Sequence, residues 1–156
     1  MTLIYHPYDS RWVALVRGGG PDDYGLPAER VTSDGAGNPC RHCLDYIAQG
    51  APMLICAARP FPALQPYAET GPIFLCADPC APYESREMLP ILRDSPQFLL
   101  KAYGADHRII YGTGRIVSAA GLERACEAVL CGAKVAYVDL RSASNNCFQA
   151  RVTRRR

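Results

Sequence analysis

The sequence contains no long apolar run and carries little net charge. Its longest apolar stretch, MLICAA at residues 53–58, is far shorter than the roughly 20 residues that a membrane-spanning helix needs. The opening MTLIYHPYDSRW lacks the charged start and apolar core of a signal peptide. A net charge of +2 is too small to indicate a nucleic-acid or membrane surface. We therefore expect a cytoplasmic protein with reduced thiols and with neither a membrane nor a nucleic acid as partner.

Several catalytic and phosphate-binding motifs are also missing. Without a Gly-x-Ser-x-Gly, the sequence has no α/β-hydrolase nucleophile elbow. The RGGGP segment at 17–21 lacks the lysine and the Ser/Thr of a phosphate-binding loop. In YGTGRIV, at 111–117, Val117 occupies the place of the third glycine of a dinucleotide loop. The three histidines do not pair at metal-ligand spacing, and eight cysteines in 156 residues fall below the density of a disulfide scaffold.

What is present indicates one globular domain over residues 1–156. The chain is 49% hydrophobic and 21% charged, which is typical of a folded protein of this size and not of a disordered one. Residues 1–37 give weak signals, and WVALV within them fits either a strand or a short helix. Residues 38–154 give stronger ones.

Two segments of this core predict helices. Asn38 is a good N-cap, Pro39 suits the first helical position and Gly50 suits the position after the last. Ser118 similarly caps a segment that ends at Gly132. Each segment has an apolar stripe at helical spacing, formed by Cys40, Cys43, Leu44, Ile47 and Ala48 in the first and by Leu122, Ala125, Cys126, Val129 and Leu130 in the second.

The remaining pattern predicts strands. Short apolar runs bounded by proline and glycine occur at 53–59 and 73–77, and residues 97–103 and 107–112 have the pattern of a hairpin. Two further strands are expected at 134–140 and 147–154, the last with alternating apolar and polar residues. The fold class that follows is α+β: a single domain with a mixed, mostly antiparallel sheet and two helices packed on it.

The C-x-x-C formed by Cys40 and Cys43 has three interpretations. The helical stripe favours two core cysteines, since free cysteine packs as a small hydrophobe. Thiol chemistry is the second, because the first turn of a helix stabilises a thiolate. A zinc site completed by Cys76 and Cys80 ranks last, since Cys76 belongs to an apolar strand and Cys80 follows Pro79 in a loop. We therefore expect no metal and no cofactor.

Arginines in polar segments beside apolar strands suggest a different site. Arg41 sits where a helix dipole disfavours a cation, so an anionic partner would explain it, either Glu69 within the chain or a ligand. The leading functional hypothesis is a cleft for a small anionic molecule. Its expected residues are Arg41, Arg141 and Arg151 for the anion, Tyr67 and Tyr103 for stacking or hydrogen bonding, and Glu69 to orient Arg41.

Two alternatives remain open at this point. One is a thiol-dependent enzyme with Cys40 as nucleophile and His42 or His107 as base. The other is a structural or partner-binding domain without catalysis. The sequence does not decide between an enzyme and a binding protein, and it does not give the oligomeric state.

The sequence also resembles the bacterial family catalogued as domain of unknown function 1203. The likeness runs from about Asn38 to Arg154 and rests on four segments: PCRHCL, PYAETGPIFL, KAYG and VAYVDLRSASNNCFQARV. The resemblance implies a compact one-domain bacterial protein and no established activity. Its matching positions include Cys40, Arg41, Tyr67, Tyr103, Cys147 and Arg151. Where the family pattern has His-x-His-Asn, this sequence has Asp139, Arg141 and Ser142, which argues against a chemistry based on those histidines.

Overall fold

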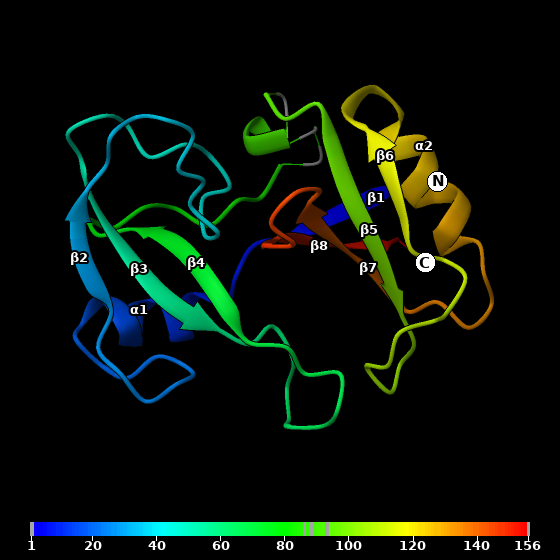
Figure 1. Ribbon diagram of the computed structural model, residues 1–156, viewed down its shortest axis with the longest axis horizontal. Helices are drawn as coiled ribbons and strands as arrows, with labels where there is room; N and C mark the ends of the chain where they lie inside the picture. Colours follow the sequence, from blue (N-terminus) through cyan, green and yellow to red (C-terminus); the bar gives the residue numbers. More distant parts are fainter. Residues whose placement is uncertain (1, 86, 88, 93, 156) are drawn as a thin grey trace. The chain divides into compact units, whose positions relative to one another are not determined.

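The computed structural model describes residues 2–85, 87, 89–92 and 94–155. The chain divides into two compact units, each drawn in Figure 1. Residues Pro7–Tyr83 form the first, which we call the cysteine-rich unit, and Met1–His6 with Glu84–Arg156 form the second, which we call the five-stranded unit. Over these described residues, two helices and two sheets of antiparallel strands make the fold α+β, as the sequence predicts.

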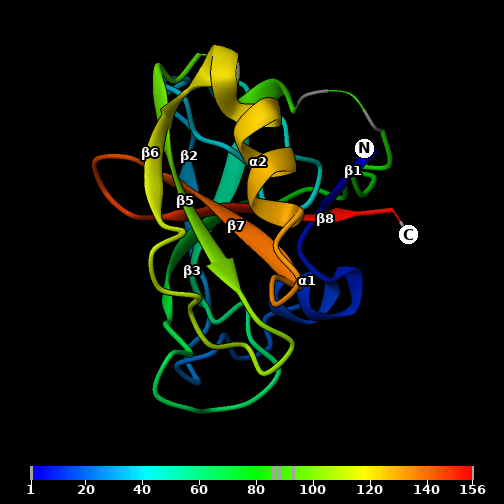
Figure 2. The same ribbon diagram turned by 90° about the vertical axis from the view of Figure 1, so that its right-hand side faces the viewer.

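The five-stranded unit contains one sheet in the strand order β1-β8-β7-β5-β6. Every neighbouring pair is antiparallel. Helix α2 (Leu122–Leu130) packs against this sheet through its predicted stripe, and Figure 2 shows it running alongside the strands. The strands are β1 (Leu3–His6), β5 (Gln97–Tyr103), β6 (Arg115–Ser118), β7 (Tyr137–Ser142) and β8 (Phe148–Arg154). Short 3-10 helices, η1 (Pro90–Leu92) and η2 (Ala119–Gly121), complete the unit.

The cysteine-rich unit contains a smaller sheet with β3 at its centre. Strands β2 (Glu29–Thr32), β3 (Pro52–Ala58) and β4 (Gly71–Cys76) lie side by side in the order β2-β3-β4. Helix α1 (Ser10–Arg17) begins at the N-cap Asp9, whose side chain accepts from the Trp12 N–H. Val13 and Val16 of this helix join apolar residues of β3 and β4 in one core.

Most of the predicted elements are present. The strands expected at 53–59, 73–77, 97–103 and 147–154 correspond to β3, β4, β5 and β8, and that at 134–140 to β7, which starts later, at Tyr137. Ser118 does act as a cap, since its hydroxyl accepts from the Gly121 N–H at 3.2 Å, and η2 leads from it into α2. Four residues of the predicted α2 stripe are buried: Leu122, Cys126, Val129 and Leu130.

Two predictions about pairing are wrong. The structure has two sheets where the sequence predicted one. The hairpin partner of 97–103 is β6 at 115–118, whereas residues 107–112 form only one isolated bridge, between Tyr103 and Ile109. Residues 107–112 and 115–118 are both short apolar segments that follow β5 in the sequence. Tertiary packing decides which of them pairs with β5.

The predicted helix at 38–50 is also wrong, and the first helix is α1 instead. The Cys40 N–H donates to the Asp45 carbonyl at 2.9 Å and the Ile47 N–H donates to the Asn38 carbonyl at 2.9 Å. Together with the bridge between Pro39 and Tyr46, these bonds close a short hairpin-like turn. Leu44 has φ 56°, which no right-handed helix allows. The capping signals at Asn38 and Gly50 therefore belong to a turn.

Within the part of the chain that the structure describes, no helix has both the length and the apolar character that crossing a bilayer would require.

Candidate metal centre

Four cysteine sulfurs meet inside the cysteine-rich unit. The Sγ atoms of Cys40, Cys43, Cys76 and Cys80 all lie within 4.8 Å of one another. Cys40 is fully buried and the other three are partly buried. Two segments contribute them, one with the spacing C-x2-C and one with the spacing C-x3-C. All four are free thiols.

The separations between sulfurs fit coordination of a single ion. Cys40 Sγ lies 3.9 Å from Cys80 Sγ, and Cys43 Sγ lies 4.0 Å from Cys76 Sγ. Zinc–sulfur bonds of about 2.3 Å in a tetrahedron place neighbouring sulfurs about 3.8 Å apart. A disulfide would require about 2.05 Å. The cluster therefore has the spacing of a tetrathiolate metal site and not that of bonded cysteines.

The first pair lies on the turn that replaces the predicted helix. The Leu44 N–H donates to the Cys40 carbonyl at 2.9 Å, and the His42 N–H points to Cys40 Sγ at 3.4 Å. Leu44, fully buried, holds the left-handed conformation directly after Cys43. That conformation costs roughly 1–2 kcal/mol for a residue with a Cβ, and such strain concentrates at functional sites.

The second pair lies at the end of β4 and just beyond it. The Arg41 N–H donates to the Phe74 carbonyl at 3.0 Å, which fixes the turn beside β4. The Cys76 N–H then donates to Cys40 Sγ at 3.3 Å. Cys80 follows after Pro79, in a segment without regular secondary structure. Backbone bonds therefore hold Cys40, Cys43 and Cys76 in place before any metal is considered.

Side chains from elsewhere in the unit reach Cys80. Arg17 Nη2 donates to Cys80 Sγ at 2.9 Å, and Arg17 Nε donates to the Cys76 carbonyl at 2.9 Å. His42 Nδ1 lies 3.3 Å from Cys80 Sγ, and His42 Nε2 lies 2.8 Å from Ser10 Oγ. Hydrogen-bond donors to thiolate sulfur are typical of the shell around a metal site.

Within the cluster, Cys40 is the thiol whose pKa is lowered, so it is the first to ionise. The thiols of Cys43 and Cys76 donate to its sulfur, and despite burial these bonds and the backbone N–H groups hold the pKa of Cys40 far below its ordinary value. The same interactions raise the pKa of Cys43 and of Cys76. Burial, with the nearby Arg17 cation second, lowers the pKa of His42, which favours a neutral ring. The cluster is thus prepared to hold negative charge on sulfur.

The residues predicted to bind an anion fall in both units. Arg41, Tyr67 and Glu69 belong to the cysteine-rich unit. Arg41 is buried, donates from Nη1 to the Pro39 carbonyl at 2.6 Å and lies with Cζ 5.7 Å from the Phe74 ring centre. Tyr67 is half-buried and Glu69 is exposed, in the loop before β4. The Arg41–Glu69 pair stays a prediction.

The other predicted residues belong to the five-stranded unit. Arg151 binds Asp139 with both ends of its guanidinium, at 2.7 Å and 3.0 Å, and Arg141 Nη1 donates to the Asn146 carbonyl at 2.9 Å. Tyr103 stacks on Tyr137, whose hydroxyl lies 2.9 Å from Nδ1 of His107, the predicted alternative base. Arg41, Arg141 and Arg151 thus contact backbone carbonyls, an aromatic ring and a carboxylate of the chain itself. These contacts add no support to the hypothesis that the three arginines bind an external anion.

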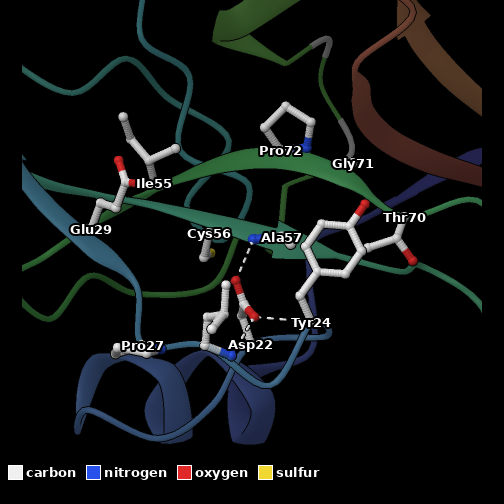
Figure 3. Close-up of a pocket in the computed structure, with 11 residues that line it drawn as sticks. Asp22, Tyr24, Pro27, Glu29, Ile55, Cys56, Ala57, Thr70, Gly71 and Pro72 are labelled. Atoms are coloured by element: carbon white, nitrogen blue, oxygen red, sulfur yellow. Dashed lines mark hydrogen bonds between the residues drawn. The ribbon is translucent and has the colours of Figure 1, made fainter.

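A pocket of about 280 Å³ lies elsewhere in the cysteine-rich unit, lined by residues of β2, β3, β4 and the loops before β2 and β4; Figure 3 shows these residues. Asp22, one of the lining residues, accepts from the N–H groups of Ala57, Tyr24 and Leu26. Burial raises the pKa of Asp22, but these three bonds outweigh it and lower the pKa overall. The carboxylate thus ties a loop to β3. None of the four clustered cysteines and none of the predicted site residues lines this pocket.

Comparison with known proteins places the chain in a family. A family model described as "Protein of unknown function (DUF1203)" matches residues 37–154. The chain belongs to this family. The match confirms the resemblance found in the sequence and covers all four clustered cysteines, whereas α1 precedes it. A search of curated proteins and a search of solved structures each found no match to the DUF1203 chain.

The sequence offers these four cysteines as one possible zinc site but favours core packing of Cys40 and Cys43. That packing requires a helix at 38–50, and no helix forms there. The placement of Cys76 in a strand and of Cys80 in a loop does not separate the cysteines either, since β4 ends at Cys76 and the following loop returns Cys80 to within 3.9 Å of Cys40. The paired spacings C-x2-C and C-x3-C were the signal available for this site.

Proposed function

We propose that the cysteine-rich unit of this DUF1203 protein binds one zinc ion through Cys40, Cys43, Cys76 and Cys80, and that the ion has a structural role. The observation that carries the proposal is the set of four sulfurs within 4.8 Å, with pair separations of 3.9 and 4.0 Å. Four thiolates in a tetrahedron are the ligand set that zinc prefers in structural sites.

The ligand set also supports a structural role over a catalytic one. Catalytic zinc keeps one position open for water or substrate, whereas four protein ligands close the coordination sphere. Such an ion would link the turn at 40–43 to the end of β4 and to Cys80, segments more than 30 residues apart in sequence. A structural ion agrees with the hypothesis of a domain without catalysis. We propose the reducing cytoplasm as the location of the protein.

The thiol-enzyme alternative finds less support in the geometry. Cys40, its proposed nucleophile, is 0% exposed and accepts backbone N–H bonds from His42 and Cys76. A sulfur so enclosed cannot reach a substrate. His42, its proposed base, lies against Cys80, and His107 belongs to the five-stranded unit.

Metal content tests the proposal. The protein, purified without chelator under reducing conditions, should contain one zinc per chain by inductively coupled plasma mass spectrometry. Cys43→Ser should lose it, because serine is a poor zinc ligand, whereas Cys131→Ser should retain it. Cys131 is exposed on the five-stranded unit and serves as the matched control.

Two outcomes would contradict the proposal. A wild-type protein that holds no metal and takes up none from added zinc has no metal site. Iron at one atom per chain, with the visible absorption of ferric thiolate, would keep the four ligands and overturn the assignment to zinc, since both metals accept tetrahedral sulfur.

A further inference from the structure

Helix α1 contacts the four-cysteine cluster directly at its last residue and through His42 at its first. Its first residue, Ser10, contacts His42, and its last residue, Arg17, contacts Cys80 and Cys76. Between them, Val13 and Val16 are buried in the core that also contains Cys40. The helix therefore lies fixed against the unit, with a polar group at each end directed to the same site.

Arg17 holds the two ends of the Cys76–Cys80 segment together. Its Nε donates to the Cys76 carbonyl at 2.9 Å and its Nη2 donates to Cys80 Sγ at 2.9 Å. A planar guanidinium presents donors in a fixed fork, so the two acceptors are held at a defined separation. Cys40 lies in an isolated bridge, Cys43 in a turn and Cys76 in β4, whereas Cys80 lies in a loop with no assigned secondary structure. Arg17 thus restrains the ligand that the backbone restrains least.

His42 adds a second donor to the same sulfur. A metal-bound thiolate has no proton and only accepts, so the contact of 3.3 Å requires His42 Nδ1 to carry the hydrogen. His42 Nε2 is then the acceptor for the Ser10 hydroxyl at 2.8 Å. A metal site commonly fixes its surrounding histidines in this manner. Ser10 therefore sets the orientation of the ring and His42 sets that of Cys80.

Charge gives a further reason for these contacts. One Zn²⁺ with four thiolates carries a net charge of −2, and such a charge is costly in a partly buried site unless cations and N–H donors surround it. Arg17 supplies a full positive charge at 2.9 Å from sulfur. The backbone N–H groups of Cys76 and His42 likewise stabilise negative charge on Cys40 Sγ, which they approach to 3.3 and 3.4 Å.

We propose that α1 supports the metal centre from outside the ligand set: Arg17 contacts Cys80 directly, and Ser10 orients His42, so that Arg17 and His42 act as positioning residues that keep Cys80 coordinated. The inference rests on the proposed zinc site. It assigns a role to a helix that lies before residues 37–154, the part of the chain that the family model matches. Without the Arg17 fork, Cys80 becomes the ligand that detaches first, and the metal exchanges.

Zinc release measures this role. The zinc-loaded full-length protein is mixed with an excess of the chromogenic chelator 4-(2-pyridylazo)resorcinol, and the release rate is compared among variants. Loss of an outer-shell partner typically costs about 10- to 100-fold in metal affinity. Because we expect that cost in the dissociation rate, Arg17→Met should release zinc about 10- to 100-fold faster than the wild type. Arg17→Lys, which restores the charge without the fork, should fall between. Arg11→Met, on an exposed position of the same helix, should match the wild type.

Alkylation distinguishes positioning from simple loss of structure. The zinc-loaded proteins are treated with iodoacetamide for increasing times, and each cysteine is followed by mass spectrometry of peptides. In Arg17→Met, Cys80 should be modified before Cys40, Cys43 and Cys76. If the variant merely unfolds, all four become modified together, and the positioning role is wrong.

The outcomes separate this inference from the proposed function. A wild-type protein with no zinc refutes the metal site itself. A wild-type protein with one zinc, together with an Arg17→Met variant that releases it at the wild-type rate, refutes the role of α1 and leaves the metal site intact.

Discussion

The cysteines of this protein differ in their chemistry because their neighbours differ. Cys126 is fully buried on α2, and burial, with Glu123 and Glu127 as smaller causes, raises the pKa of its thiol to about 12. Cys40 is equally buried, yet the thiols and N–H groups directed at its sulfur lower its pKa. Cys126 thus behaves as the small hydrophobe that its stripe predicts, whereas the Cys40 sulfur, although in the core, accepts from thiols and N–H groups.

The pKa of Cys126 leads to a prediction about stability at high pH. In the unfolded chain a cysteine ionises at about 8.5, well below the value of about 12 in the folded protein. The thiol therefore contributes its full stability below the unfolded pKa and loses it as pH rises above that value. Between about pH 8.5 and pH 10 the loss is roughly 2 kcal/mol, at about 1.36 kcal/mol per pH unit.

Urea unfolding of wild type and Cys126→Val at these two pH values measures the effect. The valine variant should lose about 2 kcal/mol less over the interval, because the other titrating groups are common to both proteins. Equal losses in the two proteins would show that the Cys126 thiol ionises as readily in the fold as in the unfolded chain.

Strands β7 and β8 are joined by more than their backbone ladder. Asp139, fully buried, accepts both donors of the Arg151 fork, and the register places the two residues opposite each other. The Arg151 Cζ lies 3.8 Å from the centre of the Tyr137 ring, which stacks on Tyr103 of β5. Arg151 and Tyr103, predicted as ligand-binding residues, thus take part in contacts that connect three strands.

Breaking the Asp139–Arg151 pair should be more harmful than replacing it. Arg151→Met leaves the Asp139 carboxylate buried without its guanidinium, which we expect to cost about 3–5 kcal/mol of unfolding free energy. The double variant Asp139→Leu/Arg151→Met removes both charges and should be more stable than Arg151→Met alone. Urea unfolding of the four proteins of this double-mutant cycle gives the values, and a double variant less stable than the single one would contradict the expectation.

At the scale of the whole molecule, the chain has two units, and the four-cysteine cluster lies entirely within one of them. The cysteine-rich unit has only three strands and one helix of eight residues. A core of this size gives little stability, and small modules of this kind commonly depend on a metal or on disulfides. The five-stranded unit has its own sheet, with α2 packed against it.

Metal removal should therefore act on one unit. Under reducing conditions with a strong chelator, hydrogen exchange should accelerate at the amides of β3 and β4, because zinc binding free energy is folding free energy for such modules. The amides of β5, β7 and β8 should keep their protection. Hydrogen–deuterium exchange with mass spectrometry, before and after chelation and after zinc is restored, provides the measurement. Loss of protection in both units together would indicate the single cooperative domain, 1–156, that the sequence predicts.

The sequence by itself determined the helices and strands whose local apolar pattern agrees with their burial in the folded protein. The stripe of α2, the cap at Ser118 and the apolar runs of β3 and β4 are local signals that burial reinforces. From them the α+β class follows, and the family segments indicated the DUF1203 membership. The sequence also contained both cysteine spacings of the candidate site, at 40–43 and 76–80.

Only the tertiary structure decided where those cysteines lie relative to one another. Local capping signals favoured a helix at 38–50, but bonds from the turn to β4 and the left-handed Leu44 overrode them. Which sulfurs meet depends on the pairing of segments more than 30 residues apart, and periodicity carries no such information. The contacts of Arg17 and His42 with Cys80 likewise could not be predicted from the sequence, since hydrogen bonds between distant segments form only when the whole unit folds.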